Sequence, residues 1–131
     1  LERYTFDSVL MPWNWFAANH PYYRPDFDET LAYCRKRGIA VQTIKAIAQG
    51  PWAAGATEDQ NTWYQPLTDE HAIRESVHWV LSEPDIFLNS VGDVDILPMV
   101  LRAADELMPK PDATAMGKLA QDQGLVSIFG I

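Results

Sequence analysis

The chain has 131 residues, of which 47% are hydrophobic and 21% charged, a balance typical of one globular domain and not of a disordered segment. Its formal net charge of −8 argues against non-specific nucleic-acid binding, which needs a basic surface. It contains no apolar run of about 18 residues, so no membrane span is expected, and its single cysteine, Cys34, is typical of a reducing compartment. We therefore expect one cytoplasmic domain over residues 1–131, with no internal boundary.

The first element expected is a strand within residues 6–15, an apolar run that ends in polar and proline residues. A loop rich in aromatic residues and proline follows. Residues 26–38 then have helix signals at both ends, because Asp26 and Glu29 have capping-box-like spacing and a glycine follows a basic last turn. The second strand, residues 39–47, comes at once, as expected of a short connection from helix to strand.

A long connection, residues 48–67, separates this strand from the second helix, and connections of this length are usually functional or flexible. Thr68 is positioned to cap a helix over residues 69–82, whose apolar residues repeat at helical spacing. The remaining elements expected are a third strand within residues 84–93, a third helix over residues 93–107 and a short last helix over residues 115–124.

The order of these elements is β-α-β-α-β-α, with apolar strands. This order predicts an α/β fold with parallel strands, helical crossovers and a sheet that is buried on both faces. Ligands of such sheets bind beyond the carboxyl ends of the strands. Lys45 lies at one such end, in the run GIAVQTIKAIAQG. Its ammonium either points at an anion or reaches water while the stem packs at the rim of the sheet.

Three blocks of the sequence resemble the C-terminal part of bacterial aldo/keto reductases in their order and spacing. The blocks are YTFDSVLMPWNW, CRKRGIAVQTIKAIAQGPW and the long run from WYQPLTDEHAIR to MVLRAADEL. The resemblance covers about residues 3–130 and implies a partial (β/α)₈ TIM barrel, made of the sixth to eighth strands with their helices and a C-terminal tail. Such barrels typically need about 250 residues, so we expect the chain to be part of one.

Members of this family reduce small aldehydes and ketones with hydride from NADPH or, less often, NADH. The resemblance places their catalytic tetrad before the residues present here, so it assigns no catalytic residue to this chain, and the chain alone is expected to be inactive. This part of the barrel contributes the groove for the NADP or NAD cofactor. The cofactor-binding residues that the resemblance implies are Met11, Ile44, Lys45, Ser90, Val91, Gly92 and Asp93.

Several of these positions depart from the family pattern. Met11 stands where many members have a glutamine that binds the nicotinamide amide, and Ile44 stands where many have an aromatic ring. Lys45 falls near the position of the pyrophosphate. A 2′-phosphate usually requires arginine or lysine in the loop after the eighth strand, whereas this chain has Asp93 and Asp95, either of which can instead cap the third expected helix. The choice between NADPH and NADH stays open.

Trp13, Trp52 and the loop residue His20 are candidates for the wall of a substrate pocket, with core packing as the alternative for the tryptophans. No metal site is expected, because His71 and His78 are too far apart for an i, i+4 metal pair. Two other hypotheses stay open. One is a half-barrel that acts without catalysis as a binding or scaffolding module, and the other is a small open sheet that binds a phosphorylated ligand. Open sheet edges favour association with another copy or with the remaining half of a barrel.

Overall fold

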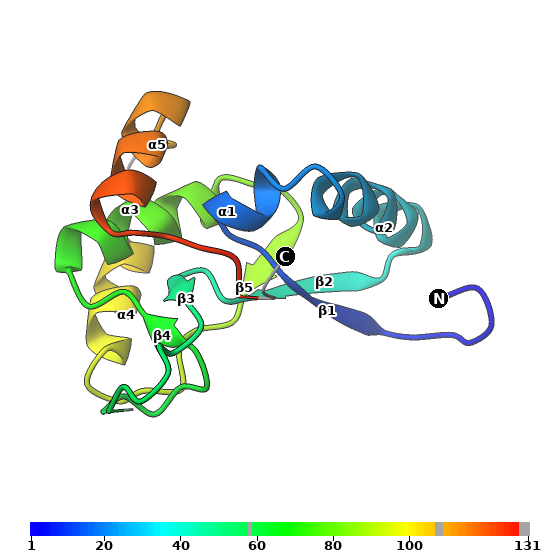
Figure 1. The fold of residues 1–131 in the computed structure, drawn as a ribbon. Helices are drawn as coiled ribbons and strands as arrows, with labels where there is room; N and C mark the ends of the chain where they lie inside the picture. The colour runs from blue at the N-terminus through cyan, green and yellow to red at the C-terminus, as the bar shows by residue number, and fades with distance from the viewer. Residues whose placement is uncertain (58, 107–108, 129–131) are drawn as a thin grey trace.

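The computed structural model describes residues 1–57, 59–106 and 109–128 (Figure 1). Its elements follow the predicted alternation of strands and helices, with a short extra helix and a small two-stranded sheet added. In chain order they are β1 (Ser8–Pro12), α1 (Trp15–Ala18), α2 (Tyr23–Arg37), β2 (Ala40–Ile44), β3 (Ala48–Gly50), β4 (Gln65–Pro66), α3 (Glu70–Leu81), β5 (Ile86–Leu88), α4 (Leu97–Asp105) and α5 (Ala113–Asp122).

Strands β1, β2 and β5 form one parallel sheet, in which the order of the strands is also their order in the chain. The register aligns Leu10 with Gln42 and Gln42 with Phe87. Parallel neighbours need a crossover connection, and helices α2 and α3 lie within the two crossovers. The prediction of an α/β fold is confirmed at this level: the chain is a mixed α/β domain built on a three-stranded parallel sheet.

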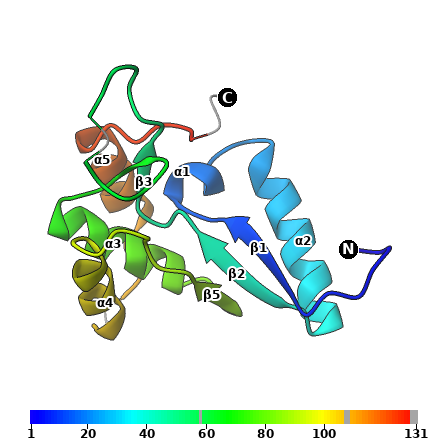
Figure 2. The same ribbon diagram turned by 90° about the horizontal axis from the view of Figure 1, so that it is seen from below.

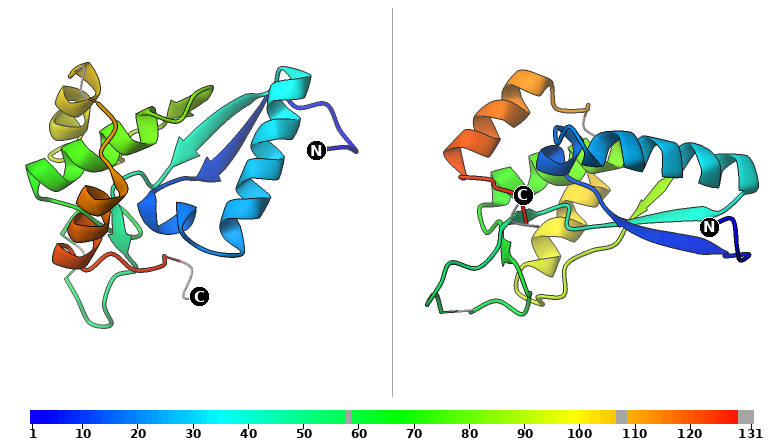
Figure 3. Two further views of the ribbon diagram at one scale, coloured as in Figure 1. Left: turned by 90° about the horizontal axis from the view of Figure 1, so that it is seen from above. Right: turned by 45° about the vertical axis from the view of Figure 1, so that its right-hand side comes forward.

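Helices α2 and α3 cover one face of this sheet (Figure 3). Val41 of β2 is buried against both helices, because side chains alternate between the two faces of a strand and every second residue points to the core. Full burial of one large apolar side chain contributes about 1.5–3 kcal/mol. The centre of the core is formed by Trp13, Phe27, Leu31, Cys34, Val41, Ile73, Val77 and Val80.

The opposite face of the sheet is open, and Figure 2 views the molecule from that side. Leu10 is 56% exposed there and Phe87 is 64% exposed. Gln42 lies between them in register, where its Nε2 donates to Ser8 Oγ at 3.2 Å and its Oε1 accepts from Asn89 Nδ2 at 3.1 Å. The prediction that the sheet is buried on both faces is therefore wrong for the described residues, because the helices cover one side alone.

Helix α2 begins at Tyr23, three residues before the predicted start, and α1 occupies part of the predicted loop. The N-cap residue Tyr22 makes no side-chain cap bond, so Asp26 lies in the first turn and the predicted capping box is wrong. The predicted end is confirmed. Gly38 follows the last turn with a left-handed φ of 68°, a conformation that glycine adopts without steric cost.

The other helices also differ from the prediction mainly at their first residues. Asp69 and not Thr68 caps α3, since Asp69 Oδ1 accepts from Ala72 N at 2.8 Å. Asp112 caps α5 in the same way, and the helix begins at Ala113, two residues before the predicted start. The predicted third helix extended to residue 107, which lies outside the described residues. The long connection is partly regular, because β3 and β4 pair antiparallel inside it.

Candidate functional site at the carboxyl ends of the strands

A buried asparagine ties the carboxyl ends of β1 and β2 together. Asn14 follows β1, and its Nδ2 donates to Lys45 O at 3.0 Å. Its Oδ1 accepts from Ala17 N at 2.8 Å and so caps α1. The backbone extends the pairing, since Trp13 N donates to Ile44 O at 2.9 Å. Hydrogen bonds of the Asn14 side chain and of the Trp13 backbone therefore fix this edge of the sheet, where ligands of parallel α/β folds bind.

Lys45 is the most unusual residue of this edge. It is only 8% exposed, and its φ of 67° is left-handed, which costs a residue with a side chain about 1–2 kcal/mol. Its Nζ lies 4.2 Å from the centre of the Trp63 ring, within the range of a cation–π contact. Burial lowers the pKa of the Lys45 ammonium below its usual range. A strained, desolvated lysine at the end of a strand is a feature that often marks functional sites.

Lys45 also lines a small cavity, together with residues at the end of β5. The other residues around it include Tyr64, Asn89, Ser90 and Val91. The volume is about 10 Å³, which is room for a water molecule and no more. Burial raises the pKa of the Tyr64 hydroxyl above its usual range.

The predicted cofactor residues are thus only partly brought together. Lys45, Ser90 and Val91 line one cavity, and Ile44 directly precedes Lys45 in the chain. Met11 lies apart from them, because its side chain packs against the core on the face that the helices cover.

Asp93 has a structural role at the end of β5. Its Oδ2 accepts from Asn61 N at 2.8 Å, and its Oδ1 accepts from the backbone N–H groups of Asp95 and Ile96 at 3.0 Å each. The hydrogen bond from Asn61, and those from Ile96 and Asp95, lower the pKa of the Asp93 carboxyl. The adjacent carbonyl of Gly92 accepts from Asn61 Nδ2 at 3.2 Å. Asp93 is therefore the aspartate that leads into α4, and it also anchors the long connection.

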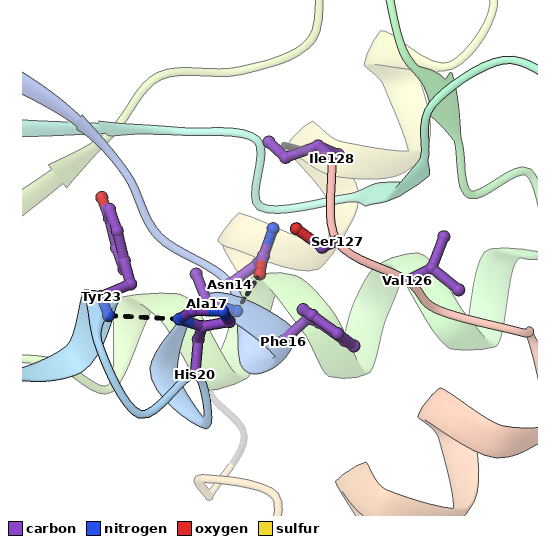
Figure 4. Close-up of a pocket in the computed structure, with 8 residues that line it drawn as sticks. All are labelled: Asn14, Phe16, Ala17, His20, Tyr23, Val126, Ser127 and Ile128. Atoms are coloured by element: carbon purple, nitrogen blue, oxygen red, sulfur yellow. Dashed lines mark hydrogen bonds between the residues drawn. The ribbon is translucent and has the colours of Figure 1, made fainter. Parts of the chain in front are cut away.

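A second cavity lies beside α1 (Figure 4). Phe16 comes from α1, His20 from the connection between α1 and α2, Tyr23 from the start of α2, and Ser127 from the C-terminal segment. His20 Nδ1 accepts from Tyr23 N at 3.3 Å, and the Tyr23 hydroxyl donates to Pro12 O at 2.6 Å. Burial raises the pKa of Tyr23 to about 12. Of the three predicted pocket residues, His20 lines this cavity.

The two predicted pocket tryptophans lie elsewhere. Trp13 is buried and stacks on Phe27 with ring centres 3.8 Å apart, and its Nε1 finds no hydrogen-bond partner among the described residues. Trp52 stabilises the long connection, because its Nε1 donates to Thr62 O at 2.9 Å. Neither residue is part of the wall of the cavity that His20 lines.

The C-terminal segment borders the site on the side of β3. Val126 N donates to Gln49 O at 2.9 Å, and Gln49 Nε2 donates to Gln123 O at 2.7 Å. A Cβ atom added at Gly50 would lie 2.5 Å from Val126 Cγ2, so only glycine allows this close approach. The segment runs between α1 and β3 in Figure 1, where it is red.

Sequence reasoning did not identify Asn14, Trp63, Tyr64 or Asn89 as parts of the site. Asn14 and Asn89 share a signal that could have found them, because each is the polar residue that follows an apolar strand on the ligand side. Trp63 and Tyr64 come from the long connection and carry no such signal.

Comparison of the chain with protein-family models, with curated proteins and with solved structures found no match. Within the described residues, no three His, Cys, Asp or Glu side chains gather so that they could hold a metal ion. None of the helices in that part of the chain has the length and apolar character needed to cross a membrane.

Proposed function

We propose that the chain forms the C-terminal, cofactor-binding part of an aldo/keto reductase-like oxidoreductase that acts on small carbonyl compounds. The observation that carries the proposal is the sheet, with three parallel strands in chain order, helices on one face and an open face bearing Leu10 and Phe87. In a (β/α)₈ barrel, helices surround the outer face, and side chains from all the strands fill the inner face. A segment of such a barrel leaves its inner face open, as this sheet does.

The cofactor implied by the resemblance is a nicotinamide dinucleotide, which supplies a hydride when bound. Lys45 and the exposed Ser90 fit a pyrophosphate, because a desolvated ammonium gains from an anionic partner. The cavity between them is small, so binding requires the exposed Trp63 ring to move away from Lys45. The role of these side chains is to neutralise and position the phosphates.

The residues after β5 do not fit a 2′-phosphate. Residues 90–96 include no arginine or lysine. The Asp93 carboxylate already accepts from two N–H groups just before α4, which are the donors that would otherwise bind an anion at a helix start. We therefore propose NADH and not NADPH as the preferred cofactor. Because the resemblance assigns the tetrad to other strands, the proposed role of this chain is to bind the cofactor and not to transfer the hydride unaided.

Titration of NADH and of NADPH into the purified chain tests the proposal, with energy transfer from tryptophan to the reduced nicotinamide as the readout. We expect saturable binding of NADH that is tighter than that of NADPH. Lys45→Met should weaken NADH binding by about 1–3 kcal/mol, the range for a hydrogen bond to a charged group. Lys36→Met is the matched control, because Lys36 is exposed in the last turn of α2.

Equal NADH affinities for the wild type and Lys45→Met, or no saturable binding of either nucleotide, would contradict the proposed role. The chain alone should also leave NADH unoxidised with a panel of aldehydes and ketones. Turnover that persists after repurification and disappears on mutation of a residue of this chain would contradict the assignment of catalysis to other strands.

A second candidate is a self-associating half-barrel without catalysis. The open face favours it, together with the outer edges of β1 and β5, which pair with no other strand among the described residues. Light scattering during gel filtration at tens of micromolar should then show species larger than a monomer, within the ~μM–mM range in which exposed edges associate. Phe87→Lys on the open face should reduce this association, whereas Leu101→Lys on the exposed side of α4 should not. A stable monomer would exclude this candidate.

A further inference from the structure

A continuous groove runs along helix α1, on the side where this helix faces α5. It is made of three cavities, and neighbouring cavities share lining residues. One of about 360 Å³ shares Trp15 and Asn19 with one of about 440 Å³, and the latter shares Phe16 and His20 with the cavity of Figure 4. The two larger volumes fall within the range of about 300–1,000 Å³ that is typical of small-molecule sites. We call this feature the α1 groove.

The middle of the α1 groove is mainly apolar and open. Trp15, Phe16, Gly117, Ala120 and Leu125 provide apolar surface, and the polar residues Asn19, His20 and Gln121 also line it. A Cβ atom added to Gly117 would meet nothing within 4 Å, so the space above α5 is open at this position. This part of the groove is lined by no Asp, Glu, Lys or Arg, and its apolar surface suits an alkyl chain.

The outer end of the α1 groove carries two cations. Arg24 and Lys110 both line it. Each lies over an indole ring, with the Arg24 guanidinium carbon 5.2 Å from the centre of the Trp13 ring and Lys110 Nζ 5.5 Å from that of Trp79. These cation–π contacts hold two positive groups at this end of the groove. On a chain with a formal net charge of −8, such a pairing of cations is a distinct local feature.

Two carboxylates lie near these cations, and neither removes their positive charge from the groove. Asp28 pairs with Arg24 Nε at 2.7 Å, but both side chains are nearly half exposed, and ion pairs of this kind contribute little. Asp112 lines the same end, where its Oδ1 accepts from Ala115 N at 2.8 Å and so serves as the cap of α5. An incoming anion would meet Lys110 directly and would share Arg24 with Asp28.

We propose that the α1 groove binds a free medium-chain fatty carboxylate, with its alkyl chain against Trp15, Gly117 and Ala120 and its headgroup at Arg24 and Lys110. The basic end of the groove favours an anionic headgroup, and the apolar middle favours an alkyl chain. A single molecule in solution is the occupant, and not a membrane surface, because the strongly acidic chain repels anionic bilayers and the apolar surface lies between two helices. The inference is independent of the oxidoreductase role proposed above.

Calorimetric titration of the chain with dodecanoate, below the concentration at which it forms micelles, tests this inference. We expect saturable binding at one site per chain, and an affinity that falls by up to about fourfold for each methylene removed, as for burial of a CH₂ group. Dodecanol, which has the same chain without the charge, should bind at least about tenfold more weakly, the loss expected when a charge-assisted hydrogen bond is absent.

Three variants separate the two halves of the groove. Gly117→Leu fills the apolar middle and should abolish binding of both probes, while the helix keeps or gains stability, because leucine favours a helix more than glycine does. Arg24→Ala combined with Lys110→Ala should weaken dodecanoate at least about tenfold and leave dodecanol unchanged. Lys118→Ala is the matched control on the same helix, because this exposed lysine pairs with Asp122 and lies outside the groove lining.

Three results would each overturn the inference. The first is no saturable binding of monomeric dodecanoate, including the case in which the chain binds only to vesicles of anionic phospholipid. The second is unchanged dodecanoate binding by a folded Gly117→Leu variant. The third is equal weakening of dodecanoate and dodecanol by the double alanine variant, which would mean that the two cations pack against the groove without recognising the charge.

Discussion

The substitution Tyr23→Phe tests whether the first turn of α2 is anchored to the end of β1. The Tyr23 hydroxyl donates to Pro12 O at 2.6 Å, and the N-cap of this helix makes no side-chain bond of its own. Without the hydroxyl, the carbonyl of Pro12 loses this donor. We expect the variant to lose about 1 kcal/mol of stability at pH 7, the usual net value of a hydrogen bond, and its Tm to fall by roughly 3–6 °C.

The same residue should make the stability of the chain depend on pH. Burial raises the pKa of Tyr23 to about 12, whereas the ordinary value is 10.0. Between these two values the folded state keeps a proton that the unfolded state loses, so the contribution of Tyr23 is complete below pH 10 and is lost as the pH rises toward 12. The difference corresponds to at most about 2.7 kcal/mol, and solvent screening of a partly exposed side chain reduces it to about 1–2 kcal/mol.

Urea unfolding of the wild type and of Tyr23→Phe, at a series of pH values from neutral to alkaline, measures this effect. Above pH 10 the stability of the wild type should fall more steeply than that of the variant. Burial also perturbs the pKa values of Tyr64 and Lys45, but both residues are present in the two proteins, so their contributions cancel in the difference. Tyr22→Phe is the matched control, because Tyr22 is 80% exposed. Parallel curves for the wild type and Tyr23→Phe above pH 10 would refute the reasoning.

Three further predictions concern the strand ends. Gly50→Ala should cost about 1–3 kcal/mol and release the C-terminal segment, because the new Cβ atom overlaps Val126, and Val126→Ala should restore both thermal stability and hydrogen-exchange protection. Asp93→Asn should increase hydrogen exchange around Asn61 and should flatten the acid unfolding curve, because the lowered pKa of Asp93 gives stability that is lost as the pH falls below about 4. Burial lowers the pKa of the Lys45 ammonium in the folded state, so the wild type should gain stability as the pH rises toward about 10.4, and Lys45→Met should remove this gain. An unchanged pH dependence in unfolding experiments would show that the amine stays hydrated.

Local sequence signals determine the strand–helix order and several boundaries, and these were predictable. Gly38 ends α2 because glycine tolerates the left-handed conformation, and Pro98 falls in the first turn of α4, where a missing N–H costs nothing. The open face was not predictable from composition. Leu10 and Phe87 are apolar, which is typical of burial, and only the tertiary arrangement leaves them without a covering layer.

The candidate site was predictable where it depends on strand ends and not where it depends on distant partners. Lys45 and Ser90 line the same cavity because the carboxyl ends of parallel strands lie along one edge. Met11 faces the helices instead. Successive side chains of a strand point to opposite faces of the sheet, and the sequence does not show which of them point to the covered face. The partners of Asp93 and Lys45 include Asn61 and Trp63 from the long connection, and no local pattern places those residues.

The order of strands in the sheet has a consequence for how the chain acquires its fold. Because β1 pairs with β2 and β2 with β5, each pairing is complete once a contiguous stretch is available, residues 8–44 for the first and residues 40–88 for the second. Neither pairing waits for a segment from the far end of the chain. During synthesis, which proceeds from the N-terminus at about 5–20 residues per second, the first β-α-β unit can therefore form while α3 is still being made. Among the long-range contacts within these 131 residues, the Asn14–Lys45 hydrogen bond would then be one of the first, and β5 would add to an edge that is already in place.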